Sequence, residues 1–514
     1  MGKIFVLPTF HATARIKNNY CWNENWVHEF ESPWSLFEKF KYANTVKDRD
    51  VLEIFGTEEI KNKKVLRRTK NNSNLYSLSG FDNLRLAEVF GHDFKQTNEE
   101  NIKNIINTLP RRTGQYLRDH LCICNECMKF GYHSILHQFK LIHNCPIHNE
   151  PLIQRCPGCD HTFNYELSDE HFASPFQCEC GYEFLNTSFP FEQWNHNNLD
   201  IVNDDVQKWL HLIPEEKSIL GDLILFEALD EEQYPDMLNN ILSVILNEDE
   251  SHNNHVILRS TKNILRYGNN LNKYLELESA INENHSLRNE KWYDRFQYKI
   301  HDEIYWSTVA TIKGIASRLR KTVMKDHRQC IKDFRYKDEP YCPYAYAYVF
   351  WRKFSENYKT YWEIDNGYRP RRSTDNLFPK FCSDTDHEEL LHIIESWNGG
   401  SHLRKYKHLA ATKWIINMVV MHISLNHFRN WIRVADHETR LRSSSEIHNQ
   451  LCMDTSYQPF QYNNLPFFLI KVPNEEKGEK VIEFHYWMNS KHTIQYERLI
   501  CRNRPGAYGV YQQS

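Results

Sequence analysis

The sequence of 514 residues has no long apolar run. The longest, Trp414–Ile423, covers ten residues and is interrupted by Asn417 and His422, whereas a helix that spans a bilayer needs about 20 apolar residues. The opening residues, MGKIFVLPTF, are too few and too weakly apolar for a secretory signal peptide. These absences predict a cytoplasmic protein with no membrane among its partners.

The chain also lacks the short motifs that mark several enzyme classes. It has no G-x4-G-K-[ST] phosphate loop, so we do not expect it to hydrolyse ATP. It has no G-x-S-x-G nucleophile elbow either. We therefore predict that the protein is not an enzyme. The alternative is a DNA nuclease or transposase whose catalytic carboxylates come from positions far apart in the sequence.

Neither sign of charge is in large excess, because 63 Lys and Arg face 67 Asp and Glu and leave a formal net charge of −4. Any surface for nucleic acid must therefore be a local basic patch, with acid elsewhere to balance it. Acid gathers in residues 200–250, which hold fourteen Asp and Glu against two Lys, and from about residue 290 the balance turns basic. We expect the acidic segment to stay off DNA.

Cysteine, by contrast, is plentiful and concentrated. Eight of the 14 cysteines fall within Cys122–Cys180. A secreted chain would spread its cysteines as a disulfide framework, whereas clustered pairs are typical of metal ligands in a reducing compartment. Two ligands a few residues apart can bind one metal from a single turn, and two such turns complete a tetrahedral zinc site. The predicted ligands are Cys124 and Cys127, Cys145 and His148, Cys156 and Cys159, and Cys178 and Cys180.

Four ligand pairs predict two structural zinc ions, and the pairs can combine in two ways. Sequential pairing gives a site of three cysteines and a histidine, followed by a site of four cysteines. Cross-braced pairing, as in RING-like domains, would join the first pair to the third. The seven residues between His148 and Cys156 are long for a cross-brace, so sequential pairing is favoured. Both sites have four protein ligands, so we expect them to stabilise the fold rather than catalyse a reaction.

The order of these residues resembles the TniQ family. It consists of Cys-x2-Cys, a hydrophobic and aromatic spacer, a His-x-Cys-Pro-x-His-x2-Pro-Leu segment over His143–Leu152, and a Cys-Pro-x-Cys segment over Cys156–Cys159. The preceding Tyr116–Arg118 and the early Glu31–Leu36 segment are also similar to that family. The resemblance covers about residues 1–185, and the length of the chain is closer to the longer TnsD branch.

TniQ and TnsD proteins are target selectors of multi-component bacterial transposons. The resemblance implies sequence-specific binding to double-stranded DNA at an attachment site, hence a nucleoid-associated protein. It also implies recruitment of an AAA+ ATPase regulator, which passes the site to transposase subunits. Two alternatives to this transposition role are DNA recognition outside a transposon, for example in defence, and a scaffold whose zinc modules bind only protein.

The expected fold is mainly α-helical and multidomain, with two small zinc modules and a C-terminal β-hairpin. The helices and the hairpin follow from the spacing of apolar residues. Long helices are expected over about 303–335, 341–358 and 404–434, and shorter ones near 82–90 and after Thr97. Near the end the period changes, which predicts paired strands over Phe467–Val472 and Val481–Trp487. The expected regions are 1–120, N-terminal and helical; 121–190, zinc modules; 191–285, acidic and helical; 286–440, basic and helical; and 441–514, hairpin and tail.

One predicted helix carries an apolar stripe and a basic stripe on opposite sides. The apolar stripe runs from Val309 to Val323 at alternating spacings of three and four. Like charges on the other stripe repel by roughly a few tenths of a kcal/mol per pair unless an anionic partner neutralises them. DNA contact is therefore favoured over a plain solvent-exposed face. The predicted DNA-binding residues are Arg318, Lys321, Lys325, Arg328 and Lys332, with Arg369, Arg371 and Arg372 in a second, loop-like segment.

Overall fold

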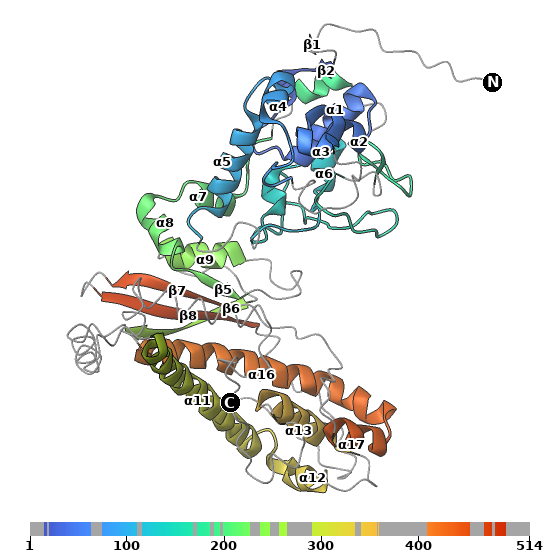
Figure 1. Cartoon of the computed structure of the whole chain (residues 1–514). Helices are drawn as coiled ribbons and strands as arrows, with labels where there is room; N and C mark the ends of the chain where they lie inside the picture. Colours follow the sequence, from blue (N-terminus) through green and yellow to red (C-terminus); the bar gives the residue numbers. More distant parts are fainter. Residues whose placement is uncertain are drawn as a thin grey trace. The chain divides into compact units, whose positions relative to one another are not determined.

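The computed structural model of the chain divides into two compact units (Figure 1). Unit 1 consists of Met1–Asp222 and Glu232–Glu250, and unit 2 of Leu223–Glu231 and Ser251–Ser514. The chain is mostly helical, as the sequence predicts. The residues that the structure describes are 15–17, 20–62, 75–109, 116–167, 172–185, 190–195, 199–226, 237–246, 256–264, 290–334, 341–356, 358, 409–452, 467–474 and 479–489.

The helices of unit 1 begin where the sequence supplies capping side chains. Ser32 caps α1 through its side chain, which accepts a hydrogen bond from the Ser35 backbone, and Pro33 occupies the first turn. Asp82 caps α4 in the same way. Asp93 caps α5, which therefore starts before Thr97, where the sequence pattern placed it. These helices are α1 (Pro33–Asn44), α2 (Asp48–Phe55), α3 (Glu58–Asn62), α4 (Asn83–Phe90) and α5 (Phe94–Ile106).

Aromatic rings fill the core among these helices. Phe55 of α2 stacks on Phe90 of α4, with ring centroids 5.4 Å apart. Phe37 of α1 stacks on Phe81 at 5.0 Å. Such rings bury large apolar areas and prefer these offset and edge-on arrangements. The short elements around this core are β1 (Arg15–Lys17), β2 (Tyr20–Trp22), η1 (Glu24–Trp26), α6 (Asn125–Lys129), η3 (Ile135–Gln138), β3 (Phe172–Ser174), β4 (Gln177–Cys178) and η4 (Phe191–Asn195).

Most of the acidic segment over residues 200–250 belongs to unit 1, and only Leu223–Glu231 belongs to unit 2. Its helices are α7 (Asp204–Leu210), α8 (Pro214–Leu220) and α9 (Met237–Leu246). The buried Trp209 indole of α7 donates to the Ile105 carbonyl of α5 at 2.7 Å, which fixes α7 against the N-terminal helices. Acidic residues occupy the first turns of α7 and α8, where the positive end of the helix dipole stabilises them.

Unit 2 contains a four-stranded antiparallel sheet in the order β5-β7-β8-β6. The strands predicted near the C-terminus pair with each other, Phe467 opposite Tyr486 and Asn474 opposite Glu479, and they form the middle of the sheet. The edge strands come from residues more than 200 positions earlier, which no local pattern could reveal. The four strands are β5 (Ile224–Phe226), β6 (Val256–Ile264), β7 (Phe467–Asn474) and β8 (Glu479–Asn489).

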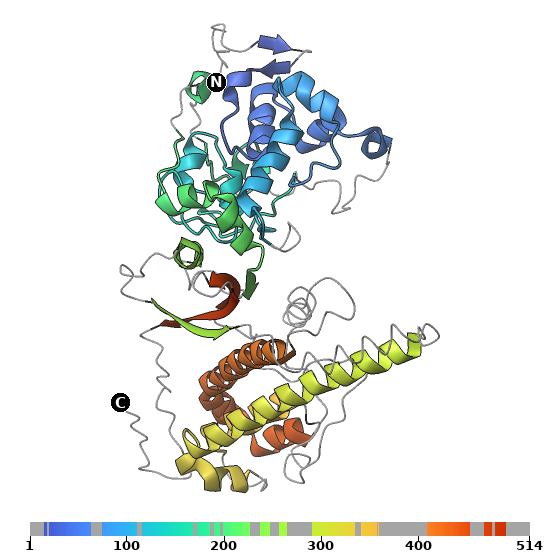
Figure 2. The same cartoon turned by 90° about the vertical axis from the view of Figure 1, so that its left-hand side faces the viewer.

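The other elements in the described part of unit 2 are helices. Figure 2 shows α11 crossing α16, and α13 packs against α16 as well. The Trp351 indole of α13 donates to the Ser424 carbonyl of α16 at 2.8 Å, and the Tyr348 hydroxyl donates to the Ala316 carbonyl of α11 at 3.0 Å. The helices are α11 (Glu290–Lys321), η7 (Lys325–His327), α12 (Arg328–Asp333), α13 (Pro343–Ser355), α16 (Leu409–Leu441) and α17 (Ser444–Cys452).

The helix expected over 303–335 is not continuous. It begins earlier, at Glu290, and ends at Lys321, after which η7 and α12 follow as separate short elements. The backbone changes direction where the Met324 amide donates to the Leu319 carbonyl, five residues back. Val323 and Met324 are buried at this turn, so apolar burial holds the break. The sequence pattern was wrong here because the apolar period runs on through the turn.

Candidate metal centres

The structure brings the eight predicted metal ligands together in two groups of four. Ligand atoms within each group lie within 4.8 Å of one another, as a bound metal ion requires. The groups follow the sequential order of the pairs, not the cross-braced order. Metal group 1 consists of Cys124, Cys127, Cys145 and His148, and metal group 2 of Cys156, Cys159, Cys178 and Cys180.

The distances in metal group 1 suit a tetrahedral site. Zinc with Zn–S distances of about 2.3 Å and Zn–N distances of about 2.1 Å sets sulfurs about 3.8 Å apart and sulfur and nitrogen about 3.6 Å apart. The Cys127 and Cys145 Sγ atoms are 3.6 Å apart. His148 Nδ1 lies 3.6 Å from Cys124 Sγ, 3.2 Å from Cys127 Sγ and 3.7 Å from Cys145 Sγ. All three cysteines are buried.

Metal group 2 has similar spacing but lies nearer to solvent. Cys156 and Cys180 bring their Sγ atoms to 3.7 Å, as do Cys159 and Cys178. Cys159 and Cys180 are exposed, whereas the other two are buried. Its four thiolates would bring more negative charge to the metal than the three thiolates and one imidazole of metal group 1.

A residue with positive φ closes the turn after each ligand pair. These residues are Gly131 (61°), Asn149 (56°), Asp160 (60°) and Gly181 (89°). Glycine adopts this conformation at little cost, and Asn and Asp tolerate it better than other residues. In three of the turns the amide of the closing residue donates back to the carbonyl of the first ligand: Asn149 to Cys145 and Asp160 to Cys156, both at 2.8 Å, and Gly181 to Cys178 at 2.9 Å. The turns therefore aim both side chains of each pair at one point.

His137 lies next to metal group 1 without being one of its four members. Its Nε2 is 3.4 Å from Cys145 Sγ and 4.0 Å from Cys127 Sγ. Burial holds the pKa of His137 well below its usual value, so the ring is neutral near pH 7. With no metal ion bound, the hydrogen bond with Cys124 raises the pKa of Cys145 to about 11. A bound divalent cation would instead lower the pKa of these thiols and favour the thiolate.

Arg118, from a segment singled out for its resemblance to TniQ, organises the loop between Cys127 and Cys145. The guanidinium is buried and donates to four backbone carbonyls, at distances of 2.6 to 3.2 Å. Its planar fork of donors suits this task better than a lysine ammonium would. One side chain thereby supplies hydrogen-bond donors to four backbone carbonyls of a loop that has little secondary structure of its own. The four carbonyls belong to His137, Phe139, Lys140 and Ile142.

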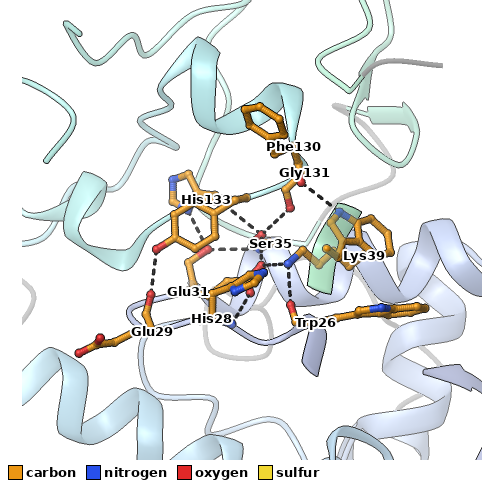
Figure 3. Close-up of polar contacts among 12 residues, drawn as sticks. Trp26, His28, Glu29, Glu31, Ser35, Lys39, Phe130, Gly131 and His133 are labelled. Atoms are coloured by element: carbon orange, nitrogen blue, oxygen red, sulfur yellow. Dashed lines mark hydrogen bonds and ion pairs between the residues drawn. The ribbon is translucent and has the colours of Figure 1, made fainter. Parts of the chain in front are cut away.

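The Glu31–Leu36 segment supports the other side of the same loop (Figure 3). The Ser35 hydroxyl donates to Glu31 Oε1 at 2.7 Å and accepts from the His133 amide at 3.1 Å. Glu31 Oε1 also lies 2.7 Å from Lys39 Nζ, and both side chains are fully buried. Lys39 in turn donates to the Trp26 carbonyl at 2.7 Å. Polar contacts therefore join α1 to the residues that follow the first ligand pair.

A second buried network connects α1 to the region of metal group 2. Glu38 accepts from the Phe176 amide at 3.1 Å and pairs with Lys41 at 2.5 Å, while Lys41 also pairs with Asp48 at 2.6 Å. Two carboxylates thus share one ammonium in a buried setting. Burial, opposed by Lys41 and reinforced by Asp48, raises the pKa of Glu38 to about 7.

This pKa predicts a pH dependence of stability that Glu38→Gln should remove. The folded chain keeps the Glu38 proton up to about pH 7, whereas the unfolded chain releases it near its ordinary value of 4.5. The folded state therefore binds more protons between these values, so its stability falls as pH rises, by up to about 1.4 kcal/mol per pH unit. Urea unfolding of parent and variant between pH 6 and 7 measures the difference. Parallel curves would show that Glu38 does not titrate in this range.

A third group, which the sequence analysis missed, lies in unit 2. His327, Cys330 and Cys342 place their ligand atoms within 4.8 Å of one another. The two cysteines do not form a short-spaced pair in the sequence, because eleven residues separate them. The available signal was His327-x2-Cys330, which has the same spacing as the Cys145 and His148 pair in reverse order. In the described residues all three groups consist of cysteine and histidine alone.

The five basic residues predicted to lie on one helix are divided among α11, η7 and α12. We call them the basic turn: Arg318, Lys321, Lys325, Arg328 and Lys332. All five are exposed, and the apolar stripe from Val309 to Val323 is buried as expected. In the part of the chain that the structure describes, no ion pair joins any of the five to an acidic side chain. Arg369, Arg371 and Arg372 lie outside the described residues.

Two further findings bear on function. None of the helices in the described ranges combines the length and the apolar composition needed to cross a membrane. In comparisons with known proteins, no family model, no curated protein and no solved structure matches the chain.

Proposed function

We propose that the chain is a sequence-specific DNA-binding target selector of the TniQ and TnsD type. In this proposal two structural zinc ions hold unit 1 together and the basic turn of unit 2 contacts double-stranded DNA. The bound protein recruits an AAA+ ATPase regulator, which hands the site to the transposase subunits. The chain itself catalyses no reaction.

The ligand sets support zinc as the metal of groups 1 and 2. Thiolate and imidazole ligands in tetrahedral arrangement select zinc over the oxygen-seeking cations magnesium and calcium. Four protein ligands at each group leave no coordination position for a water, which is the pattern of a structural site. The Glu31–Leu36 and Tyr116–Arg118 segments, which carry part of the resemblance to TniQ, contact the loop around metal group 1.

The observation that carries the DNA-binding proposal is the exposure of the basic turn. Arg318 and Lys321 end α11, and Lys325, Arg328 and Lys332 follow within the next eleven residues. Exposed cations without acidic partners concentrate positive potential, which phosphate groups neutralise with release of counterions. Arg318 and Arg328 are the better candidates for reading guanine, since a guanidinium can pair with two acceptors on one base. The lysines are the better candidates for phosphate contacts.

Alanine substitutions in the basic turn should weaken DNA binding without unfolding the protein. The parent protein first selects its preferred duplex from a random library, and each single variant is then titrated with salt on this duplex and on a scrambled one. A residue that contacts phosphate should lower affinity equally for both and reduce the salt slope by about 0.9. One that reads a base should cost about 1–3 kcal/mol on the selected duplex alone.

Arg440→Ala is the matched control. Arg440 is also an exposed cation of unit 2, but it pairs with Asp436 at 2.5 Å one helical turn away. This variant should bind both duplexes as the parent does. If all five variants of the basic turn also bind like the parent, the turn is a plain solvent-exposed face. DNA contact would then have to lie elsewhere, with Arg369, Arg371, Arg372 and the Lys61–Lys70 segment next to be tested.

A further inference from the structure

We propose that unit 2 holds a third metal site, in which His327, Cys330 and Cys342 bind a zinc ion. This inference does not depend on the proposed role in DNA binding. It rests on three soft ligands that the fold brings to one point, far from metal groups 1 and 2 in the sequence. The chain would then carry three zinc ions rather than the two predicted from its sequence.

Three consecutive elements deliver the ligands. His327 is the last residue of η7, Cys330 lies in the first turn of α12, and Cys342 is the N-cap of α13. The break after Lys321 is what turns η7 and α12 so that His327 and Cys330 face the start of α13. At the N-cap, Cys342 lies at the positive end of the α13 dipole, which favours a negative thiolate there.

One ligand separation in the third group matches those of the first two. His327 Nδ1 lies 3.4 Å from Cys342 Sγ, close to the separation of about 3.6 Å that two ligands of one zinc ion adopt. The His327 ring stacks on Tyr344 with centroids 4.2 Å apart and planes 18° apart, so the ring orientation is fixed. Both cysteines are almost wholly buried, at 3% and 1% exposure, and His327 is at 8%.

A plain apolar core does not account for this arrangement as well. Buried cysteine alone often acts as a small apolar side chain. Here a buried imidazole directs its Nδ1 at one of two neighbouring thiols, in a cluster whose other members include Met324, Phe334 and Tyr341. Zinc bound by two cysteines and a histidine is a known set of three protein ligands, which leaves one position for a water or another ligand.

Such an ion would fix the basic turn. Lys325 belongs to η7, and Arg328 and Lys332 belong to α12, the same two elements that carry His327 and Cys330. A bond from each of these ligands to an ion that also holds Cys342 would anchor η7 and α12 to the start of α13. Loss of the ion should therefore leave α11 and α13 folded while the peptides around 322–334 exchange their amide hydrogens faster.

Metal analysis of the full-length protein tests the proposal. After expression with zinc and exhaustive dialysis, the parent should retain about three zinc ions per chain. Cys330→Ser and Cys342→Ser should each lose about one ion and keep the other two. Cys21→Ser is the control, since Cys21 is a half-buried cysteine outside all three groups, and it should keep three.

A measurement on the unsubstituted protein covers the case in which these variants fail to fold. Cadmium-113 NMR of the cadmium-loaded parent should give three resonances, because the three sites differ in their number of thiolates. Two resonances together with two zinc ions per chain would overturn the proposal. So would peptide mapping under non-reducing conditions that found Cys330 joined to Cys342 by a disulfide.

Discussion

Cys127→Ser should unfold unit 1 under conditions in which the parent is fully folded. Cys127 is buried, and its Sγ lies 3.6 Å from Cys145 Sγ and 3.2 Å from His148 Nδ1, so its loss leaves metal group 1 with three of its four ligands. Binding of a structural zinc ion contributes about 10–16 kcal/mol to the free energy of folding at pH 7. A whole domain is typically stable by only about 5–15 kcal/mol. Losing the ion therefore removes most or all of the stability of unit 1.

Zinc content and amide hydrogen exchange measure this effect together. The variant should carry about one zinc ion fewer than the parent, and its peptides from residues 116–167 should lose their protection. Cys122→Ser is a matched control, because Cys122 is buried in the same segment but belongs to no metal group. A Cys127→Ser protein that kept both its zinc content and its protection would show that metal group 1 does not hold unit 1 together.

Lys39→Met should destabilise unit 1 by about 3–5 kcal/mol, because it leaves the Glu31 carboxylate buried without its partner. Lys39 Nζ and Glu31 Oε1 are 2.7 Å apart, and neither side chain has any exposure to solvent. The methionine side chain fills a similar volume but cannot donate to the Trp26 carbonyl, which Lys39 contacts at 2.7 Å. Urea unfolding at pH 7 in the presence of zinc measures the loss.

An exposed ion pair and a double variant make this test specific. Arg49→Ala removes a pair with Glu53 whose side chains are 70% and 58% exposed, and it should change stability by less than about 1 kcal/mol. Adding Glu31→Gln to Lys39→Met should recover part of the loss, since the unpaired charge is then gone. A Lys39→Met protein as stable as Arg49→Ala would mean that water reaches Glu31.

The features that the sequence predicted best are local ones. The ligand pairs lie within single turns, and Asp82 and Ser32 cap helices through contacts three residues away, so a short window contains all the information. The third metal group needs a turn that brings residue 342 to residues 327 and 330. The spacing of His327 and Cys330 was the one local signal, and no short window of sequence contains Cys342 as well.

Other features escaped prediction because they depend on tertiary packing. The helix break after Lys321 follows from the burial of Val323 and Met324, while the apolar spacing alone favours one continuous helix. The Lys39–Glu31 pair is also invisible in the sequence, since charged residues are rarely fully buried and nothing local marks these two. The roles of Arg118 and Ser35 emerge only when the loop that they contact is in place.

The order of strands in unit 2 has a consequence for the synthesis of the chain. β6 ends at Ile264, but its partner β8 begins at Glu479, so more than 200 residues must leave the ribosome before the two can pair. At about 5–20 residues per second this takes roughly 10–40 s. During that interval unit 1 already has every residue from Cys124 to Cys180 that it needs to bind metal. The backbone hydrogen-bonding groups of β5 and β6, however, still lack the strands with which they pair. An unpaired strand edge invites pairing with other chains, so the nascent protein is most exposed to aggregation after the residues of metal groups 1 and 2 have been synthesised and before its last strand arrives.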